Sequence, residues 1–385
     1  MSTVPTIHPD ELKNEIDSGE QVTIVDVRGP GAFDEWHIDG PTVDAVNVPV
    51  GQLQAVQPSS LLEDVPADNV VAVCASGQTS TFATQLLNQA GIETRNLQYG
   101  MNGWANLYTY TEVASDADAT VLQFARPSSG CLAYLVVSDG EAAVVDPLLA
   151  FVDDYIEVAA EYDAEISYVL DTHVHADHIS GLRAFATRSD ADLLVPEPAV
   201  DRGIAYDVDY ETVAHEDSLS VGESSVDVVY TPGHTSGMTA YLVDGAVLLS
   251  GDGLFTESVA RPDLEDGDEG APEAAARLHR SLQERVLSLP DEAVVAPAHY
   301  SDSAGQAGDG SYTATLGDLA ASMDALSMSE SAFVDYVLSD MPPRPSNHSR
   351  IIETNLGQQD TPDYVAFQLE LGPNNCAASQ EAMTD

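Results

Sequence analysis

The sequence predicts a parallel α/β domain followed by a larger, β-rich domain. In the first hundred residues, short apolar strands at 22–28, 45–48 and 69–73 are followed by loops and by a helical stretch at 82–87. Strands that alternate with helices favour a parallel sheet. Further along the chain, several apolar strands are each followed directly by a metal-binding side chain. The polar stretch 111–120 between the two parts is predicted to be a linker.

The segment 172–178 concentrates metal-binding side chains, namely His173, His175, Asp177 and His178. It follows an apolar, β-prone run, so these side chains lie where a buried strand ends in a loop. In extended chain His173 and His175 project to the same side, whereas the other two follow a turn. The segment can therefore serve one metal ion or two.

Three further donors occupy the same kind of position. His234 follows a strand at 226–230, Asp252 follows one at 246–250, and His299 ends the apolar run that begins at Val294. A β-scaffold brings distant residues to one rigid point in this way. We therefore expect a metal site, and we expect the five other histidines to be ordinary surface or core residues, namely His8, His37, His215, His279 and His348.

These motifs, in this order, resemble the metallo-β-lactamase superfamily. The resemblance rests on the HxHxDH run at 173–178, the TPGHT turn at 231–235, the SGD strand end at 250–252 and the PAH strand end at 297–299. It extends over about 119–357. It implies an αββα sandwich with the metal at one edge.

Within that superfamily the chain is most similar to the persulfide dioxygenase branch. The similarity lies in residues 171–181, 261–264 and 341–345. It implies one Fe²⁺ held by His173, His234 and Asp252, with open positions for a persulfide sulfur and O₂. His175, Asp177, His178 and His299 would then hydrogen-bond to ligands and waters. The resemblance also implies that Arg261 steadies an anionic substrate, the alternative being a structural salt bridge.

The glyoxalase II branch is the near neighbour, and it implies a different chemistry. Such a site holds two Zn²⁺ ions per chain, bridged by a carboxylate, and generates hydroxide for thioester hydrolysis. All seven donors that a two-metal site needs are present, so the sequence alone does not choose between the two branches.

Residues 3–114 resemble a rhodanese domain. The DVR strand end, the turn at 37–40, the loop 74–80 and the stretch 100–104 carry the similarity. Cys74 lies where a strand runs into a helix N-terminus, a position that favours thiolate over thiol. We expect Cys74 to carry sulfur as a persulfide. Thr79 stands where the family usually has an arginine, and this departure makes a degenerate, binding-only domain the alternative.

Composition sets the expected environment. The chain has 64 acidic and 13 basic residues and a formal charge of −51, with 44% hydrophobic residues in clear strand runs. Such self-repulsion largely disappears at molar salt, where the Debye length is about 3 Å, so we expect a halophilic source.

Without a basic patch, nucleic acid is excluded as a partner. No apolar run or leader pattern suggests a membrane or export, so we expect a cytoplasmic protein, with homo-oligomerisation left open.

Three smaller expectations complete the prediction. The widely spaced cysteines indicate no disulfide framework. Cys131 is expected to be a packing residue, and Cys376 to lie in a polar, structureless tail at 372–385. A helix is expected to open at Pro272 and to stop before Pro290.

The sequence therefore predicts an α/β rhodanese domain at 1–115, an αββα metallo-β-lactamase sandwich at 119–357 and a C-terminal extension at 358–385. The expected function is iron-dependent oxidation of a thiol persulfide to sulfite, with sulfur transfer by the first domain. A two-zinc thioester hydrolase is the alternative, and a non-catalytic sulfane-sulfur binding protein is the third possibility.

Overall fold

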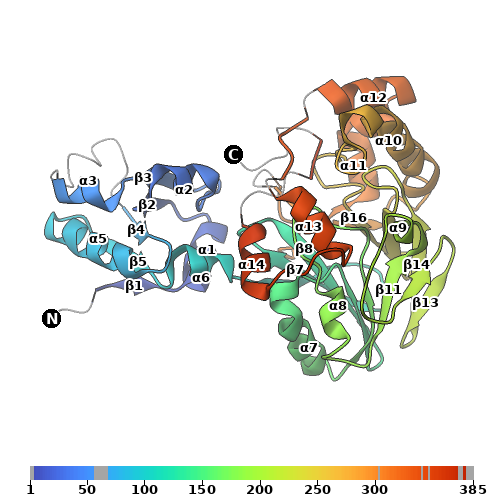
Figure 1. The fold of residues 1–385 in the computed structure, drawn as a ribbon, viewed down its shortest axis with the longest axis horizontal. Helices are drawn as coiled ribbons and strands as arrows, with labels where there is room; N and C mark the ends of the chain where they lie inside the picture. The colour runs from blue at the N-terminus through green and yellow to red at the C-terminus, as the bar shows by residue number, and fades with distance from the viewer. Residues whose placement is uncertain are drawn as a thin grey trace. The chain divides into compact units, whose positions relative to one another are not determined.

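A computed structural model describes residues 4–55, 68–301, 304–339, 341–345, 347–371 and 376–378 (Figure 1). The chain divides into two compact units, the first formed by residues up to Tyr108 together with Arg126–Ser129 and Leu371, and the second by most of the chain from Thr109 on. Within the described ranges, no helix combines the length and the apolar character needed to cross a bilayer.

The first unit is built on a five-stranded parallel sheet. Its order is β1 (Thr6–Ile7), β5 (Thr94–Leu97), β4 (Val70–Val73), β2 (Val22–Asp26) and β3 (Val43–Asn47). The helices are α1 (Pro9–Asp17), α2 (Pro30–Glu35), α3 (Val50–Ala55), α5 (Gln78–Gln89) and α6 (Gly100–Ala105).

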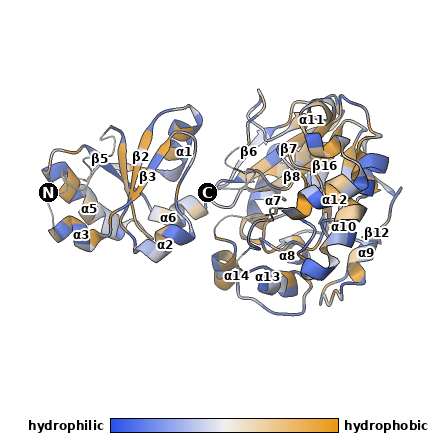
Figure 2. Cartoon of the chain, turned by 90° about the horizontal axis from the view of Figure 1, so that it is seen from above, coloured by the Kyte–Doolittle hydropathy of each residue, from blue (hydrophilic) through white to orange (hydrophobic). Residues whose placement is uncertain are grey.

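Both faces of this sheet are covered by helices. Ile24 and Val71 pack with α1 and α6. Their chain neighbours Val25 and Val70 belong to a cluster with α3 and α5. Because neighbouring strand residues point to opposite faces, a strand covered on both sides must be apolar throughout. Figure 2 shows hydrophobic residues concentrated on the central strands of this unit. The predicted parallel α/β domain is confirmed.

The second unit contains two sheets. The seven-stranded sheet has the order β12 (Glu211–Val213), β11 (Asp192–Pro196), β10 (Glu165–Leu170), β9 (Glu141–Val145), β8 (Cys131–Ser138), β7 (Thr120–Arg126) and β6 (Thr109–Glu112). The six-stranded sheet has the order β13 (Ser218–Val221), β14 (Ser224–Tyr230), β15 (Thr239–Val243), β16 (Val247–Gly251), β17 (Val294–Pro297) and β18 (Ala314–Thr315).

The two sheets pack face to face, with helices outside. Tyr134 from one sheet and Tyr241 from the other share a buried core. The outer face of the six-stranded sheet, at Leu248 for example, packs against the later helices. These elements are α7 (Val152–Glu161), α8 (Leu182–Phe185), α9 (Glu197–Val200), α10 (Gly267–Ser281), α11 (Leu316–Ser322), α12 (Glu330–Ser339), α13 (His348–Asn355) and α14 (Asp363–Leu369), with single turns at Leu149–Phe151, Leu282–Val286 and Asp324–Ser327.

Aromatic packing shows how the seven-stranded sheet is covered. The ring of Tyr155 on α7 lies 4.9 Å from that of Phe124 on β7 and 6.4 Å from that of Phe185 on α8. Helices therefore cover the outer face of this sheet as well, and the layers run helix, sheet, sheet, helix (Figure 1). The αββα prediction is confirmed.

Two local expectations were wrong. The helix expected to open at Pro272 begins five residues earlier, at Gly267, and Pro272 lies inside α10. Pro272 has no N–H to donate to the carbonyl four residues back, that of Asp268, so the helix lacks this one hydrogen bond near its start. Cys376, expected in a structureless tail at 372–385, is buried, and residues 376–378 pair with 259–261; the rest of that tail lies outside the described residues.

Candidate functional sites

Three of the predicted donors face one another in the second unit. The Nε2 atoms of His173 and His234 each lie 3.6 Å from Asp252 Oδ2. All three atoms are buried, and none has a hydrogen-bond partner among the described residues. Two ligands of one ion, each about 2.1 Å from it, lie roughly 3.0–3.4 Å apart. Unpaired buried polar atoms at nearly this spacing fit a bound metal ion.

Hydrogen bonds behind the rings fix their orientation. His173 Nδ1 lies 2.9 Å from Thr172 Oγ1, and His234 Nδ1 donates to the carbonyl of Arg261 at 2.9 Å. The strand end before Asp252 also comes unusually close to Thr172, because a Cβ at Gly251, where φ is +54°, would lie 2.7 Å from Thr172 Oγ1. The second nitrogen of each ring is therefore the one left for a ligand.

The charge of the trio suits a divalent cation. Burial lowers the pKa of His173 and of His234, so both imidazoles are neutral near pH 7, the form that binds metal. Burial alone would protonate Asp252. The neighbouring charged ring of His299, which also hydrogen-bonds to the carboxylate, outweighs burial and holds the pKa of Asp252 well below its ordinary value.

The other four predicted residues each form a hydrogen bond, although His175 Nδ1, Asp177 Oδ1 and His178 Nε2 have no partner among the described residues. His299 places Nδ1 2.5 Å from Asp252 Oδ1 and Nε2 2.5 Å from Asp177 Oδ2. Burial disfavours the charged ring, but Asp177 and Asp252 raise the pKa of His299 well above its usual value. Both ring nitrogens therefore donate. His178 Nδ1 lies 3.3 Å from the same Asp177 oxygen.

His175 Nε2 lies 3.0 Å from Asp146 Oδ1, and its Nδ1 has no hydrogen-bond partner among the described residues. Asp146 also accepts from the amide and the hydroxyl of Thr172, at 2.6 and 2.9 Å. One buried carboxylate thus holds both ends of the Thr172–His175 turn. The sequence reasoning missed this role of Asp146, although a lone aspartate after an apolar strand is the signal that could have found it.

Arg261 is buried in a network of its own. Its guanidinium donates to both carboxylate oxygens of Asp263, at 2.7 and 3.0 Å, and to the carbonyls of Pro342 and Pro343, both at 2.9 Å. These contacts fix the turn whose carbonyl orients His234. Binding of an anionic substrate by Arg261 stays a prediction.

Two cysteines that were not expected at the site border it. Cys131 Sγ donates to Asp177 Oδ2 at 3.3 Å. Cys376 is 1% exposed, and its thiol belongs to a cluster with Asp177, Asp252 and His299 in which one donor atom from each residue lies within 4.8 Å of the others. All three cysteines of the chain lie in described residues, and none forms a disulfide, as expected.

The loop that holds Cys74 lies in the first unit, between β4 and α5. Cys74 Sγ accepts from both the amide and the hydroxyl of Ser80, each at 3.2 Å. Burial raises the pKa of the thiol, but the Ser80 hydroxyl and the amides of Ser80, Ser76 and Gly77 outweigh it, so the pKa of Cys74 falls below its ordinary value. The loop therefore stabilises a thiolate without the usual arginine.

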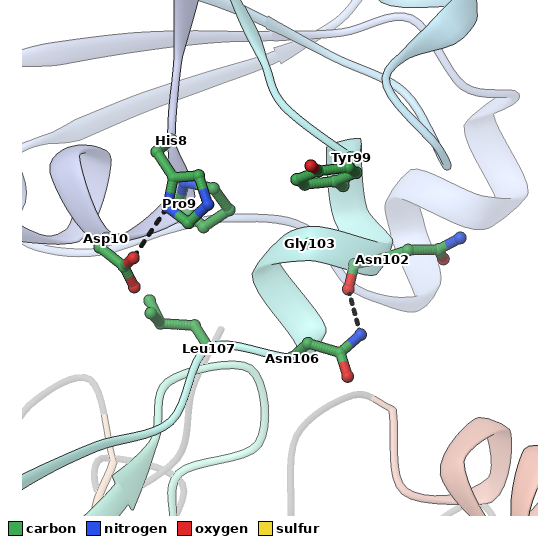
Figure 3. A pocket seen from close by; sticks show the side chains of 8 residues that line it. All are labelled: His8, Pro9, Asp10, Tyr99, Asn102, Gly103, Asn106 and Leu107. Atoms are coloured by element: carbon green, nitrogen blue, oxygen red, sulfur yellow. Dashed lines mark hydrogen bonds and ion pairs between the residues drawn. The ribbon is translucent and has the colours of Figure 1, made fainter.

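A separate cavity of about 400 Å³ in the first unit lies between α1 and α6 (Figure 3). Its lining includes His8, whose Nδ1 lies 2.8 Å from Asp10 Oδ2, and the exposed ring of Tyr99. Cys74 is not among the lining residues, so we assign no sulfur chemistry to this cavity.

Comparison with protein families matches each unit to one family. Residues 8–107 match the rhodanese-like domain, and residues 127–299 match the metallo-beta-lactamase superfamily. The chain is a rhodanese domain followed by a metallo-β-lactamase fold. The seven predicted donors lie in the metallo-β-lactamase fold, and Cys74 lies in the rhodanese domain.

The relatives of this chain include two kinds of enzyme. The mitochondrial persulfide dioxygenase ETHE1 of Mus musculus is 27% identical over 48% of this chain and 70% of that protein. A hydroxyacylglutathione hydrolase of Xanthomonas euvesicatoria is 35% identical, over 43% of this chain and 58% of that protein. The crystal structure of ETHE1 from Myxococcus xanthus is 27% identical, with a TM-score of 0.52, over 61% of this chain and 97% of that one.

Proposed function

We propose that the metallo-β-lactamase fold of this chain is a mononuclear iron site that oxidises a small thiol persulfide to sulfite. Fe²⁺ would be held by His173, His234 and Asp252, and when bound it supplies adjacent positions for the substrate sulfur and O₂. The overall change is RSSH + O₂ + H₂O → RSH + SO₃²⁻ + 2 H⁺. Similarity to ETHE1 supports the substrate class.

One observation carries the proposal of a single metal. The atoms of the first trio are unpaired and 3.6 Å apart, whereas His299 already bonds Asp252 and Asp177 at 2.5 Å. A second ion would have to break both of these bonds. The trio is thus an open set of donors, and the second set is closed at both ring nitrogens of His299.

Within this proposal the closed set orients the open one. His299 holds the oxygen of Asp252 that does not face the trio, and Asp177 holds His299 in turn. His175 fixes the turn that carries His173 through Asp146. Arg261 is proposed to act mainly by positioning His234 through its carbonyl.

A two-zinc thioester hydrolase remains the second candidate, because a specific observation favours it. Asp177 Oδ1 and His178 Nε2 are buried and unpartnered among the described residues, and both belong to the second donor set of a two-metal site. Similarity to hydroxyacylglutathione hydrolase points the same way.

The number and kind of metal ions separate the two candidates. We expect anaerobically purified protein to hold about one iron per chain, because one donor set is open. Elemental analysis after growth with both iron and zinc checks this. Two zinc ions per chain would contradict the iron proposal and favour the hydrolase, and a protein without metal would favour a sulfur-binding role.

The remaining proposals concern the surroundings of the reaction. We propose a small-molecule persulfide and O₂ as the partners of the site. The charge of −51 supports a salt-rich cytoplasm as the working environment.

We propose that Cys74 is the sulfur-accepting nucleophile of the rhodanese domain. Cys74→Ser is expected to abolish sulfur transfer from thiosulfate but to leave oxidation of a small persulfide largely unchanged, because the two sites lie in different domains. Ser80→Ala is expected to raise the pH midpoint of Cys74 alkylation, since the hydroxyl that stabilises the thiolate is removed. Mass spectrometry of the Cys74 peptide measures the midpoint. Full transfer activity in Cys74→Ser would show that the domain is degenerate.

A further inference from the structure

The C-terminal segment 376–378 carries a thiol into the metal centre. Its backbone pairs with the 259–261 segment: the amide of Arg261 donates to the carbonyl of Cys376 at 3.1 Å, and the amide of Ala378 donates to the carbonyl of Val259 at 2.9 Å. These bonds place Cys376 behind the turn that orients His234. The position of the thiol is therefore fixed by the fold.

The thiol meets groups that the proposed reaction uses. Cys376 Sγ lies within 4.8 Å of one donor atom each of Asp177, Asp252 and His299. Asp252 Oδ2 and Asp177 Oδ1 are both buried and without a partner among the described residues. A cysteine that only fills space in the core does not need unpaired carboxylate oxygens beside it. We therefore regard the thiol of Cys376 as part of the site.

We propose that Cys376 is an in-chain sulfur acceptor, which takes the sulfane sulfur from an incoming thiol persulfide and presents it to the centre formed by His173, His234 and Asp252. This inference rests on the proposed persulfide oxidation. It adds Cys376 as a covalent carrier of the sulfane sulfur. The descriptions of the matching families and relatives name no such carrier. The small thiol would then leave before oxygen is used.

The transfer balances without a further reactant. Cys376 Sγ attacks the terminal sulfur of R–S–SH, the donor S–S bond breaks, and the products are Cys376–S–SH and RSH. The proton of the Cys376 thiol ends on the departing RS⁻. Oxidation then follows as for any persulfide: Cys376–S–SH + O₂ + H₂O gives Cys376–SH, SO₃²⁻ and 2 H⁺.

Geometry keeps the added sulfur in the centre. A new S–S bond is about 2.05 Å long, well under the span of the cluster, so the terminal sulfur stays among the groups around Sγ. Because the thiol is 1% exposed, loading requires the 376–378 segment to part from 259–261, and two backbone hydrogen bonds hold that pairing. We therefore expect loading of Cys376 to be slower than that of Cys74.

The test follows the sulfur by mass, on iron-loaded full-length protein in molar KCl. Cys74→Ser removes the other acceptor and serves as the background. This protein is mixed anaerobically with cysteine persulfide, alkylated and digested. We expect the Cys376 peptide to be one sulfur atom heavier and one cysteine to be released per chain. The extra sulfur should disappear, as sulfite, when O₂ is admitted.

Two double variants sharpen the result. Cys74→Ser/Cys376→Ser is expected to lose both the loading and at least about tenfold in turnover. Cys74→Ser/Cys131→Ser, which alters the other buried thiol near the centre, is expected to keep the loading. An unmodified Cys376 peptide during active turnover would overturn the proposal, and the measurement holds even if the Cys376 variant folds poorly.

The outcome also separates this inference from the function on which it rests. Sulfur that loads onto Cys376 but yields no sulfite with O₂ supports the acceptor role and contradicts the dioxygenase. Sulfite that forms without any loaded Cys376 supports the dioxygenase and contradicts the acceptor role.

Discussion

His173→Ala, His234→Ala and Asp252→Ala are each expected to abolish iron binding and persulfide oxidation. Each substitution removes one of the three unpaired donor atoms that face one another in the trio. A facial set with two donors left cannot hold Fe²⁺ tightly against water. Iron content after anaerobic purification measures the effect.

Two control variants distinguish the loss of a metal ligand from the loss of another histidine. His175→Ala removes a ring that supports the turn, and it should weaken metal affinity by roughly 10 to 100-fold without abolishing it. His215→Ala, which alters a ring bonded to the carbonyl of Val228, should keep full iron content. If a trio variant kept its iron, or if His175→Ala lost as much as His173→Ala, the assignment of ligands would be wrong.

Asp146→Ala is expected to lower the free energy of unfolding by on the order of 3 kcal/mol, because it leaves buried partners unpaired. The carboxylate is 1% exposed and accepts from the amide and hydroxyl of Thr172 and contacts His175. It also adopts a φ of +54°, a conformation that aspartate and asparagine tolerate better than alanine. Urea unfolding in molar KCl measures the loss.

The matched variants separate these contributions. Asp146→Asn keeps the shape and the tolerance of positive φ, so it should cost clearly less than Asp146→Ala. Asp153→Ala removes a carboxylate that is paired on the surface with Arg188, and it should cost less than about 1 kcal/mol. Equal losses in Asp146→Ala and Asp153→Ala would contradict the structural role given to Asp146.

Much of the fold could be predicted because strand patterns are local. The apolar runs ending at Leu170, Tyr230 and Ser250 each became a strand with bounds within two residues of those expected. The start of α10 was misplaced because proline is typical of the first helical position, whereas here the helix begins at Gly267 and Pro272 lies inside it.

The donors could be predicted for the same reason, but their grouping could not. His299 occupies a strand end like Asp252, yet it bonds Asp252 and Asp177 and closes the second set. The carboxylate of Asp146 and the thiol of Cys376 join the centre through contacts 29 and 124 residues away in sequence, with His175 and Asp252. Such contacts depend on the packing of the two sheets and of the C-terminal segment, and no local pattern records them.

The most direct test offers the protein two substrates in molar KCl: a low-molecular-weight persulfide and, separately, a lactoyl thioester. O₂ uptake, sulfite and released thiol are followed together. We expect O₂ consumption matched to sulfite with the persulfide and no cleavage of the thioester, because one open donor set cannot hold the bridging hydroxide of a two-metal site. Thioester hydrolysis without O₂ uptake, in protein shown to be folded, would contradict the proposed function.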